Sequence, residues 1–123
     1  MTTEIPSKNW QELCRRVSEL HRGTVNIRLL EPNGKSSAGA GNIHFRSMIF
    51  QKQTDCNDVL LIETGLPDQR PAQHQILEPI RLVLRKDGAN GRFNLMEILA
   101  EDGTTEITFH PGLNLDSVDK LSA

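Results

Sequence analysis

The spacing of the apolar residues changes at Gly23, and this change limits the folds that are open to the chain. Before Gly23, apolar residues recur at the 3.6-residue period of a helix with one buried face. After Gly23 they recur at every second position, which is typical of half-buried strands. One amphipathic helix followed by several strands predicts an α+β fold. The helical stripe consists of Trp10, Leu13, Cys14, Val17, Leu20 and His21.

Both ends of the predicted helix carry signals of their own. Ser7 or Asn9 is suited to the N-cap, and Asn9 with Glu12 three residues later resembles a capping box. Gly23 is suited to a left-handed C-terminal stop, and the positive charge of Arg22 favours the carbonyl end of the helix. The sequence therefore predicts a helix that ends just before Gly23.

The rest of the chain is predicted to form antiparallel strands joined by polar turns. In residues 42–52 the alternation slips at Ser47, which predicts a β-bulge or a sharp bend. Residues 59–65 are apolar on both faces, as expected of a central strand covered on each side. Pro79 interrupts the stretch that begins at His74, which favours an edge position or a strand boundary.

A hairpin signal stands near the end of the chain. Asp102 and Gly103 are the residue pair favoured in two-residue type I′ turns. Such a turn places apolar residues of the two strands opposite each other, Ile98 with Ile107 and Met96 with Phe109, and points Glu97 and Thr108 away from them.

Together these patterns predict an α+β domain whose N-terminal amphipathic helix packs on a curled antiparallel sheet or a partly open barrel of five to seven strands. We assign residues 7–110 to this domain, residues 1–6 to an N-terminal tail and residues 111–123 to a loosely ordered C-terminal tail. Trp10, the only tryptophan, is expected to anchor the helix on the sheet. Its truncation to Ala should cost about 3–5 kcal/mol if the ring is buried.

The charge balance and the scarcity of aromatic residues argue against nucleic-acid binding. Lys plus Arg number 14, Asp plus Glu number 16, and aromatic residues make up 4% of the chain. A nucleic-acid binder normally has an excess of cations for phosphates and rings for stacking. The first residues do not resemble a signal peptide, and no apolar run is long enough to cross a bilayer. We expect a cytoplasmic protein with reduced cysteines and no membrane partner.

Three short motifs, taken in order, resemble those of a family of small uncharacterised bacterial proteins. They are Trp10 followed by "HRG" at 21–23, "HQILEPI" at 74–80, and "DGTTEITF" at 102–109. The resemblance spans residues 6–110 and implies a bacterial, single-domain protein with no assigned activity. Cys14 and Cys56 are not part of the pattern. The matching positions are His21, Arg22, Gly23, His74, Pro79, Asp102 and Gly103.

Two histidines are candidates for chemistry. His21 is suited to a general base or a metal ligand, but a structural histidine that binds carbonyls at the helix end is the favoured interpretation. His74 has Glu78 four positions further on, on the same face of a straight strand, where the carboxylate would raise the pKa of the imidazole. For His74 we nevertheless favour a half-buried strand residue that binds a backbone carbonyl.

A metal site and a cysteine nucleophile are weaker hypotheses. No C-x-x-C or H-x-x-x-H spacing is present, and the glycine-rich stretch after Glu31 matches no phosphate-binding motif. No cofactor is therefore predicted. A Cys56–His74 pair would need to be assembled by the fold. The residues that would hold a metal are Cys56, Asp55 and Asp58, joined by His44 or His110 from neighbouring strands.

Three classes of function remain open. The favoured one is a non-catalytic binding or accessory domain that self-associates, because strand edges pair readily and the apolar residues at 59–65 exceed what one helix covers. The first alternative is an Sm-like RNA-binding barrel, which has a similar order of elements. The second alternative is an enzyme or metal protein that uses His74, Glu78 and Cys56.

Overall fold

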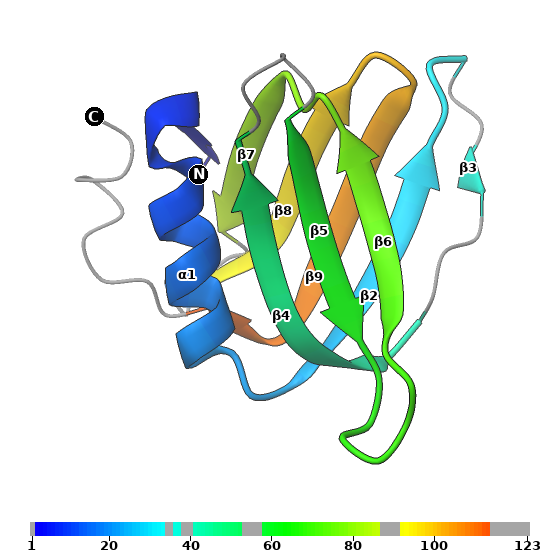
Figure 1. The fold of residues 1–123 in the computed structure, drawn as a ribbon. Coiled ribbons are helices and arrows are strands. Elements are labelled where there is room, and N and C mark those ends of the chain that lie inside the picture. Colours follow the sequence, from blue (N-terminus) through cyan, green and yellow to red (C-terminus); the bar gives the residue numbers. More distant parts are fainter. Residues whose placement is uncertain (1, 34–35, 38–40, 53–57, 87–91, 114–123) are drawn as a thin grey trace.

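One helix and nine strands make up the part of the chain that the computed structural model describes, residues 2–33, 36–37, 41–52, 58–86 and 92–113 (Figure 1). A short 3-10 turn, η1 (Ser7–Asn9), leads into the helix α1 (Trp10–Leu20). The strands are β1 (Thr2–Ile5), β2 (Thr24–Leu30), β3 (Ser36–Ser37), β4 (Ile43–Gln51), β5 (Val59–Thr64), β6 (Ala72–Leu77), β7 (Arg81–Lys86), β8 (Phe93–Ala100) and β9 (Gly103–Leu113).

All pairings in the sheet are antiparallel, and its strand order is β1-β7-β8-β9-β2-β4-β5-β6, with β3 beside the end of β2. The two end strands, β1 and β6, do not pair, so the sheet is not closed. The α+β class and the N-terminal helix on an antiparallel sheet are confirmed. The predicted number of strands is too low, because the short strands β1 and β3 have no alternating pattern that a sequence reading detects.

The predicted tails need correction at both ends. Residues Thr2–Ile5 form β1, which pairs with β7, although residues 1–6 were expected to be a tail. Ile5 is buried, and its carbonyl accepts a 2.7 Å hydrogen bond from Nε1 of Trp10, so the indole fastens this strand. At the other end β9 continues to Leu113, past the predicted boundary at residue 110.

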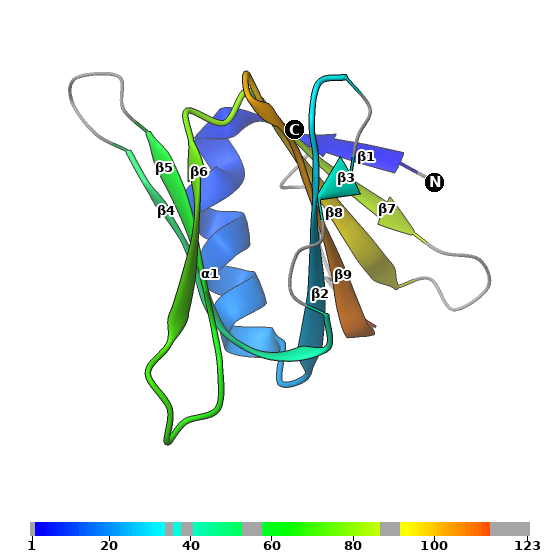
Figure 2. The same cartoon turned by 90° about the vertical axis from the view of Figure 1, so that its right-hand side faces the viewer.

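The sheet divides into two wings at β4 (Figure 2). β4 pairs with β2 only through Thr24–His44 and Val25–Ile43, and then continues with β5 alone. We call β4, β5 and β6 the small wing, and β1, β7, β8, β9, β2 and β3 the large wing. The helix α1 lies between the two wings and packs mainly on β4. Opposite α1, the space between β6 and the β2–β3 pair is the open side, which faces the viewer in Figure 2.

A bulge in β4 confirms the irregularity predicted at Ser47. Phe45 pairs with Thr64 and Ser47 with Glu63, so the register shifts between them and Arg46 is the extra residue. The extra residue reverses the phase of the alternation. Phe45 and Met48, which would otherwise point to opposite faces, are therefore both buried in the core.

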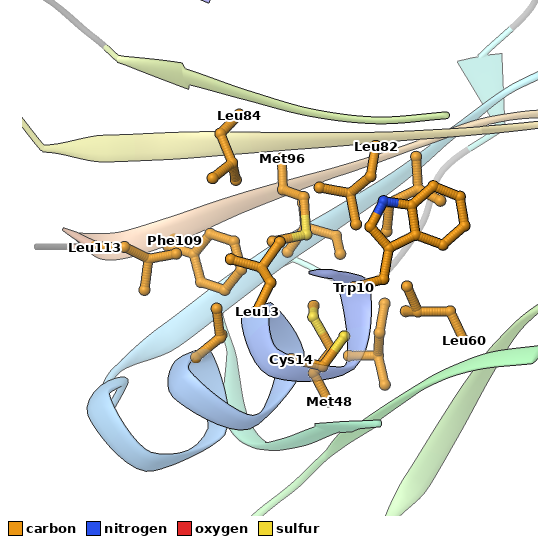
Figure 3. Close-up of a cluster of buried hydrophobic side chains, with 14 of the residues drawn as sticks. Trp10, Leu13, Cys14, Met48, Leu60, Leu82, Leu84, Met96, Phe109 and Leu113 are labelled. Carbon is orange, nitrogen blue, oxygen red and sulfur yellow. The ribbon is translucent and has the colours of Figure 1, made fainter. Parts of the chain in front are cut away.

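The core fills the space between the two wings and the helix (Figure 3). Trp10 is only 4% exposed and lies edge-on to Phe50 at a ring distance of 5.3 Å, which confirms its predicted anchoring role. Leu20, assigned to the same helical stripe, is instead 58% exposed at the end of the helix. The largest fully buried side chains are Phe109, Ile5, Leu13, Ile27, Met48, Leu60, Ile62, Leu82, Leu84, Met96, Ile98 and Ile107.

Two of the predicted helix-end signals act differently in the structure. The Asn9 side chain makes no capping bond, and the Glu12 carboxylate binds Arg15 and Arg16 in place of closing a capping box. Gly23 is not in the left-handed conformation. A Cβ atom there would lie 2.0 Å from the carbonyl oxygen of His110, so close approach of β9 requires the glycine. The predicted contact of the Arg22 cation with the helix end is present, through Ser18 O at 3.3 Å.

The register of the β8–β9 hairpin differs from the prediction by two residues. Ala100 pairs with Gly103, so Glu101 and Asp102 form the turn, and Gly103 is the first residue of β9. Gly103 has φ +145°, and a Cβ atom there would lie 2.4 Å from the carbonyl oxygen of Leu30 on β2. Gly103 is therefore required because it allows the start of β9 to lie close to the backbone of β2. The shift by two keeps the predicted faces but changes the partners to Ile98–Thr105 and Met96–Ile107.

Candidate functional site

The strand β6 presents an edge without a partner strand in the described part of the chain. The backbone N–H of Glu78 donates to Asp58 O at 2.7 Å, which extends the β5–β6 pairing by one residue. By antiparallel alternation, the backbone groups of Gln73, Gln75 and Leu77 therefore point to the open side. The sequence of β6, AQHQIL, has no charged residue and no proline, the features that usually protect an edge. Pro79 lies between β6 and β7, at the strand boundary predicted for it.

A cavity of about 260 Å³ lies between this edge and the large wing. Ile76 on β6 is buried, and Leu29 on β2 is 47% exposed, so apolar side chains line the cavity from both wings. Leu29 alternates with the buried Val25 and Ile27, but β4 of the small wing pairs only with the start of β2, so the end of β2 that carries Leu29 is not covered by the small wing. We call this cavity the groove. Its lining is Leu29, Leu30, Glu31, Gln75, Ile76, Ala100, Asp102, Gly103, Thr104 and Thr105.

A second depression, which we call the side pocket, adjoins the groove and shares Asp102 with it. Two strongly exposed apolar side chains line it, Leu77 at 59% and Ile80 at 65%. Their backbone is ordered, because the N–H of Ile80 donates to Leu99 O at 2.7 Å and Glu78 is held through Asp58. The side pocket is lined by Leu77, Glu78, Ile80, Glu101 and Asp102.

The charged side chains that line the groove and the side pocket are all carboxylates. No lysine or arginine lines either depression in the described part of the chain. The site therefore combines apolar surface, a free strand edge and a negative rim. The rim carboxylates are Glu31, Glu78, Glu101 and Asp102, and all four residues are exposed.

Comparisons of the chain with protein-family models, curated proteins and solved structures found no match. The resemblance to a family of small bacterial proteins therefore stays a prediction. In the part of the chain that the structure describes, no helix is long and apolar enough to cross a membrane.

His74 lies on β6 opposite Ile62, half-buried and facing the interior. This confirms the predicted half-buried strand position. Its Nε2 atom is buried without a hydrogen-bond partner among the described residues, so the predicted bond to a carbonyl is not formed there. Burial lowers the pKa of His74. The direction is opposite to the one expected from Glu78, which lies past the end of β6 at φ +48° and lines the side pocket.

His21 is a structural residue. It is buried at the end of α1, and its Nε2 lies 3.0 Å from the carbonyl oxygen of Thr24. The imidazole packs edge-on against Phe45 at 5.3 Å and Phe109 at 5.1 Å. Burial lowers the pKa of His21, and the Thr24 bond opposes this shift. The favoured interpretation of His21 is confirmed, although its carbonyl partner lies just beyond the helix.

The weaker candidate sites are not found among the described residues. Cys56 and Asp55 lie outside the described residues. Among the described residues, no three His, Cys, Asp or Glu side chains form a group that could hold a metal ion. Asp58 uses its carbonyl oxygen to bind Glu78 N, while His44 and His110 lie on strands on opposite sides of Thr24. The other cysteine, Cys14, is buried, which raises the pKa of its thiol to about 12.

Sequence reasoning missed most of the apolar side chains at the site. In the sequence Ile80 alternates with Leu82 and Leu84, but only the latter two are buried, because β7 begins at Arg81. For Leu77 the sequence contains no signal of its exposure. The carboxylates of Glu78, next to Pro79, and of Glu101 and Asp102, at the predicted turn, are the sequence signal that could have pointed to this end of the molecule.

Proposed function

We propose that this chain is a non-catalytic binding domain that takes an extended segment of a partner protein along the free edge of β6. The observation that carries the proposal is the edge of β6, which is uncharged and has no partner strand among the described residues, directly beside a groove lined by both apolar and polar side chains. A partner strand would pair with the outward backbone groups of Gln73, Gln75 and Leu77, and backbone pairing of this kind supplies affinity. Every second side chain of that strand would enter the groove, which supplies selectivity.

Gln75 offers a direct test of strand addition. Its N–H points to the open side, so Gln75→Pro removes a donor that the isolated fold does not use. Gln75→Thr keeps the donor and is the matched control. Twelve-residue peptides selected on the wild-type protein from a random library are expected to bind Gln75→Pro at least about tenfold more weakly, a loss of about 1.4 kcal/mol. Gln75→Thr should bind them as the wild type does.

The same experiment can overturn the proposal. Thermal unfolding and circular dichroism must first show that Gln75→Pro folds like the wild type. If the library yields no peptide that binds the wild type, or if the selected peptides bind all three proteins equally, strand addition at β6 is wrong.

Self-association is a second candidate, supported by the outer face of the small wing. Residues 59–65 were expected to be covered on both faces. In the structure Leu60 and Ile62 are buried, whereas Val59 and Leu61 on the other face are half-buried beside Ile49, which is 44% exposed. A second copy packed on this face would provide the missing cover.

Light scattering tests this second candidate. The wild type is expected to be a dimer, and Ile49→Asp a monomer. Leu20→Asp, a change at another exposed apolar side chain, on α1, should leave the dimer intact. A wild type that stays monomeric at millimolar concentration would contradict self-association.

The other two hypotheses gain less support. An Sm-like RNA-binding role would place phosphates beside the carboxylates of the open side, where like charges repel. An enzyme using His74, Glu78 and Cys56 would need a contact that is not seen between the first two residues, and Cys56 is outside the described residues. A cytoplasmic, bacterial setting remains a prediction from the sequence.

A further inference from the structure

We infer that the partner segment is basic, with lysines or arginines interleaved with apolar residues. The inference rests on the proposed function, because it specifies the chemistry of the strand that the β6 edge receives. Four exposed carboxylates, Glu31, Glu78, Glu101 and Asp102, rim the groove and the side pocket. A segment with cations at the rim and apolar side chains on Leu29 and Ile76 matches both features of the surface.

Among the described residues, the arginines that adjoin the groove and the side pocket in the sequence are paired with other carboxylates. Arg28 precedes the groove residues of β2, but its guanidinium binds Glu106 at 2.8 Å. Arg81 follows Ile80 of the side pocket, but it is paired with Glu4. Both arginines are engaged on the outer face of the large wing. No rim carboxylate forms an ion pair within the described part of the chain, so the negative potential of the rim favours the approach of a basic partner.

A second copy of the chain is a poorer occupant of the groove. The strand that a second copy would most simply offer is its own free edge β6, and AQHQIL contains no lysine or arginine. Its pairing would also bring a second set of rim carboxylates to the interface, where like charges cost free energy. The charge of the rim thus selects a different, basic chain over a second copy.

Apolar contacts would set the register of the basic segment. Alternate side chains of a strand lie about 6.6 Å apart on one face, so every second side chain of the segment would face the groove, whose lining includes Leu29 and Ile76. Outside the groove, Leu77 and Ile80 present apolar surface on ordered backbone, against which the long stems of lysine or arginine can pack. The segment is therefore expected to alternate apolar and basic residues.

Three eight-residue probe peptides test this inference by fluorescence anisotropy. The first alternates Leu and Lys, the second has Ser in place of Lys, and the third has Glu in place of Lys. The Leu–Lys peptide is expected to bind most tightly and the Leu–Glu peptide most weakly. The affinity for the Leu–Lys peptide should fall as the salt concentration rises, because exposed charges are screened.

Removing the charges of rim carboxylates tests whether the Leu–Lys peptide binds at the rim. The double variant Glu31→Gln, Asp102→Asn is expected to weaken Leu–Lys binding by roughly three- to thirtyfold. A control variant with Glu19→Gln and Asp68→Asn removes exposed carboxylates from α1 and from the β5–β6 loop. It should bind as the wild type does. Equal loss in both variants would mean that the peptide senses only the net charge, which overturns the inference.

The outcomes separate the inference from the proposed function. If the three peptides bind equally well and Gln75→Pro abolishes their binding, strand addition holds and the basic partner is wrong. If the Leu–Lys peptide needs the rim carboxylates but binds Gln75→Pro normally, a basic ligand is recognised without strand addition. Selected peptides rich in acidic residues, or a failure of all three probes to bind, would overturn the inference.

Discussion

At the scale of single residues, burial decides the chemistry of the polar side chains in the core. His21 is held between Phe45 and Phe109, and His74 faces the interior of the small wing without a partner for Nε2 among the described residues. Burial disfavours the charged imidazole in both cases, so both pKa values are lowered. The two residues are neutral members of the fold at neutral pH.

The lowered pKa values predict a loss of stability in mild acid. In the unfolded chain a histidine titrates near 6.5, and in the folded protein it titrates at a lower pH. Each neutral histidine therefore contributes to the free energy of unfolding at a pH above its pKa in the unfolded chain. This contribution is lost as the pH falls through the pKa of the folded protein, because the unfolded chain binds the proton at a higher pH. The free energy of unfolding, measured by urea denaturation, should therefore decrease from pH 7 to pH 5.

The His74→Leu variant shows how much of the pH dependence of the free energy of unfolding is due to His74. Its free energy of unfolding should depend less steeply on pH than that of the wild type, with His21 supplying the remainder. His74→Gln also removes the titrating group but keeps a polar side chain, so it should show the same reduced slope. A wild-type slope in both variants would mean that His74 keeps an ordinary pKa in the folded protein.

At the scale of elements, glycines decide how closely neighbouring strands approach. Gly103 and Gly23 were both assigned to local turns or stops. Each is instead required by a neighbouring strand, since a Cβ atom would strike Leu30 O at the first position and His110 O at the second. The hairpin register follows from this, because Glu101 and Asp102 form the turn when Gly103 lies inside β9 against β2.

Gly103→Ala should therefore be strongly destabilising. The new Cβ would lie 2.4 Å from a backbone carbonyl, and the φ of +145° is unfavourable for alanine. We expect a loss of about 2–4 kcal/mol in the free energy of unfolding. Thr104→Ala, at the next and half-buried position, should cost less than about 1.5 kcal/mol and serves as the control. Equal costs at the two positions would contradict the packing of β2 against Gly103.

At the scale of the whole molecule, the helix lies between the two wings and packs mainly on the small wing. β2 and β4 pair at only two positions, and β4 is the strand with which α1 makes most of its contacts. At the edge of β4, the Ser18 hydroxyl supplies the hydrogen bonds to Met48 that the backbone of a neighbouring strand would otherwise make. It donates to Met48 O at 2.9 Å and accepts from Met48 N at 2.8 Å. The divergence of the wings on the other side of the molecule creates the groove.

Ser18→Ala should loosen the small wing. The substitution leaves two backbone groups of Met48 without their partner, which costs about 1–3 kcal/mol. Hydrogen exchange of the Met48 amide should become faster, while amides in β8 and β9 exchange at a rate that follows global stability. Glu19→Ala, on the exposed face of the same helix, is the control and should leave Met48 unchanged. Unaltered exchange at Met48 in Ser18→Ala would contradict this role.

The apolar periods alone determined the class of fold, the position of α1, the burial of Trp10 and the bulge after Phe45. Each of these features depends on which face of a single helix or strand is apolar, and the spacing of apolar residues within that element shows this face. Glu78 and Asp102 were also noted from the sequence, although as a partner for His74 and as a turn residue.

Only the tertiary structure decided the strand order, the pairing of β1 with β7, the register of β8 with β9 and the divergence of the wings. These features depend on contacts between segments far apart in the chain. The local spacing of apolar residues shows which face of a strand is buried, but it does not show which other strand packs against that face. Leu29 and Ile80 show the consequence, because the alternation of apolar residues predicts that both are buried, whereas both are exposed. Leu29 is exposed because β4 pairs only with the start of β2, and Ile80 is exposed because it lies before the start of β7.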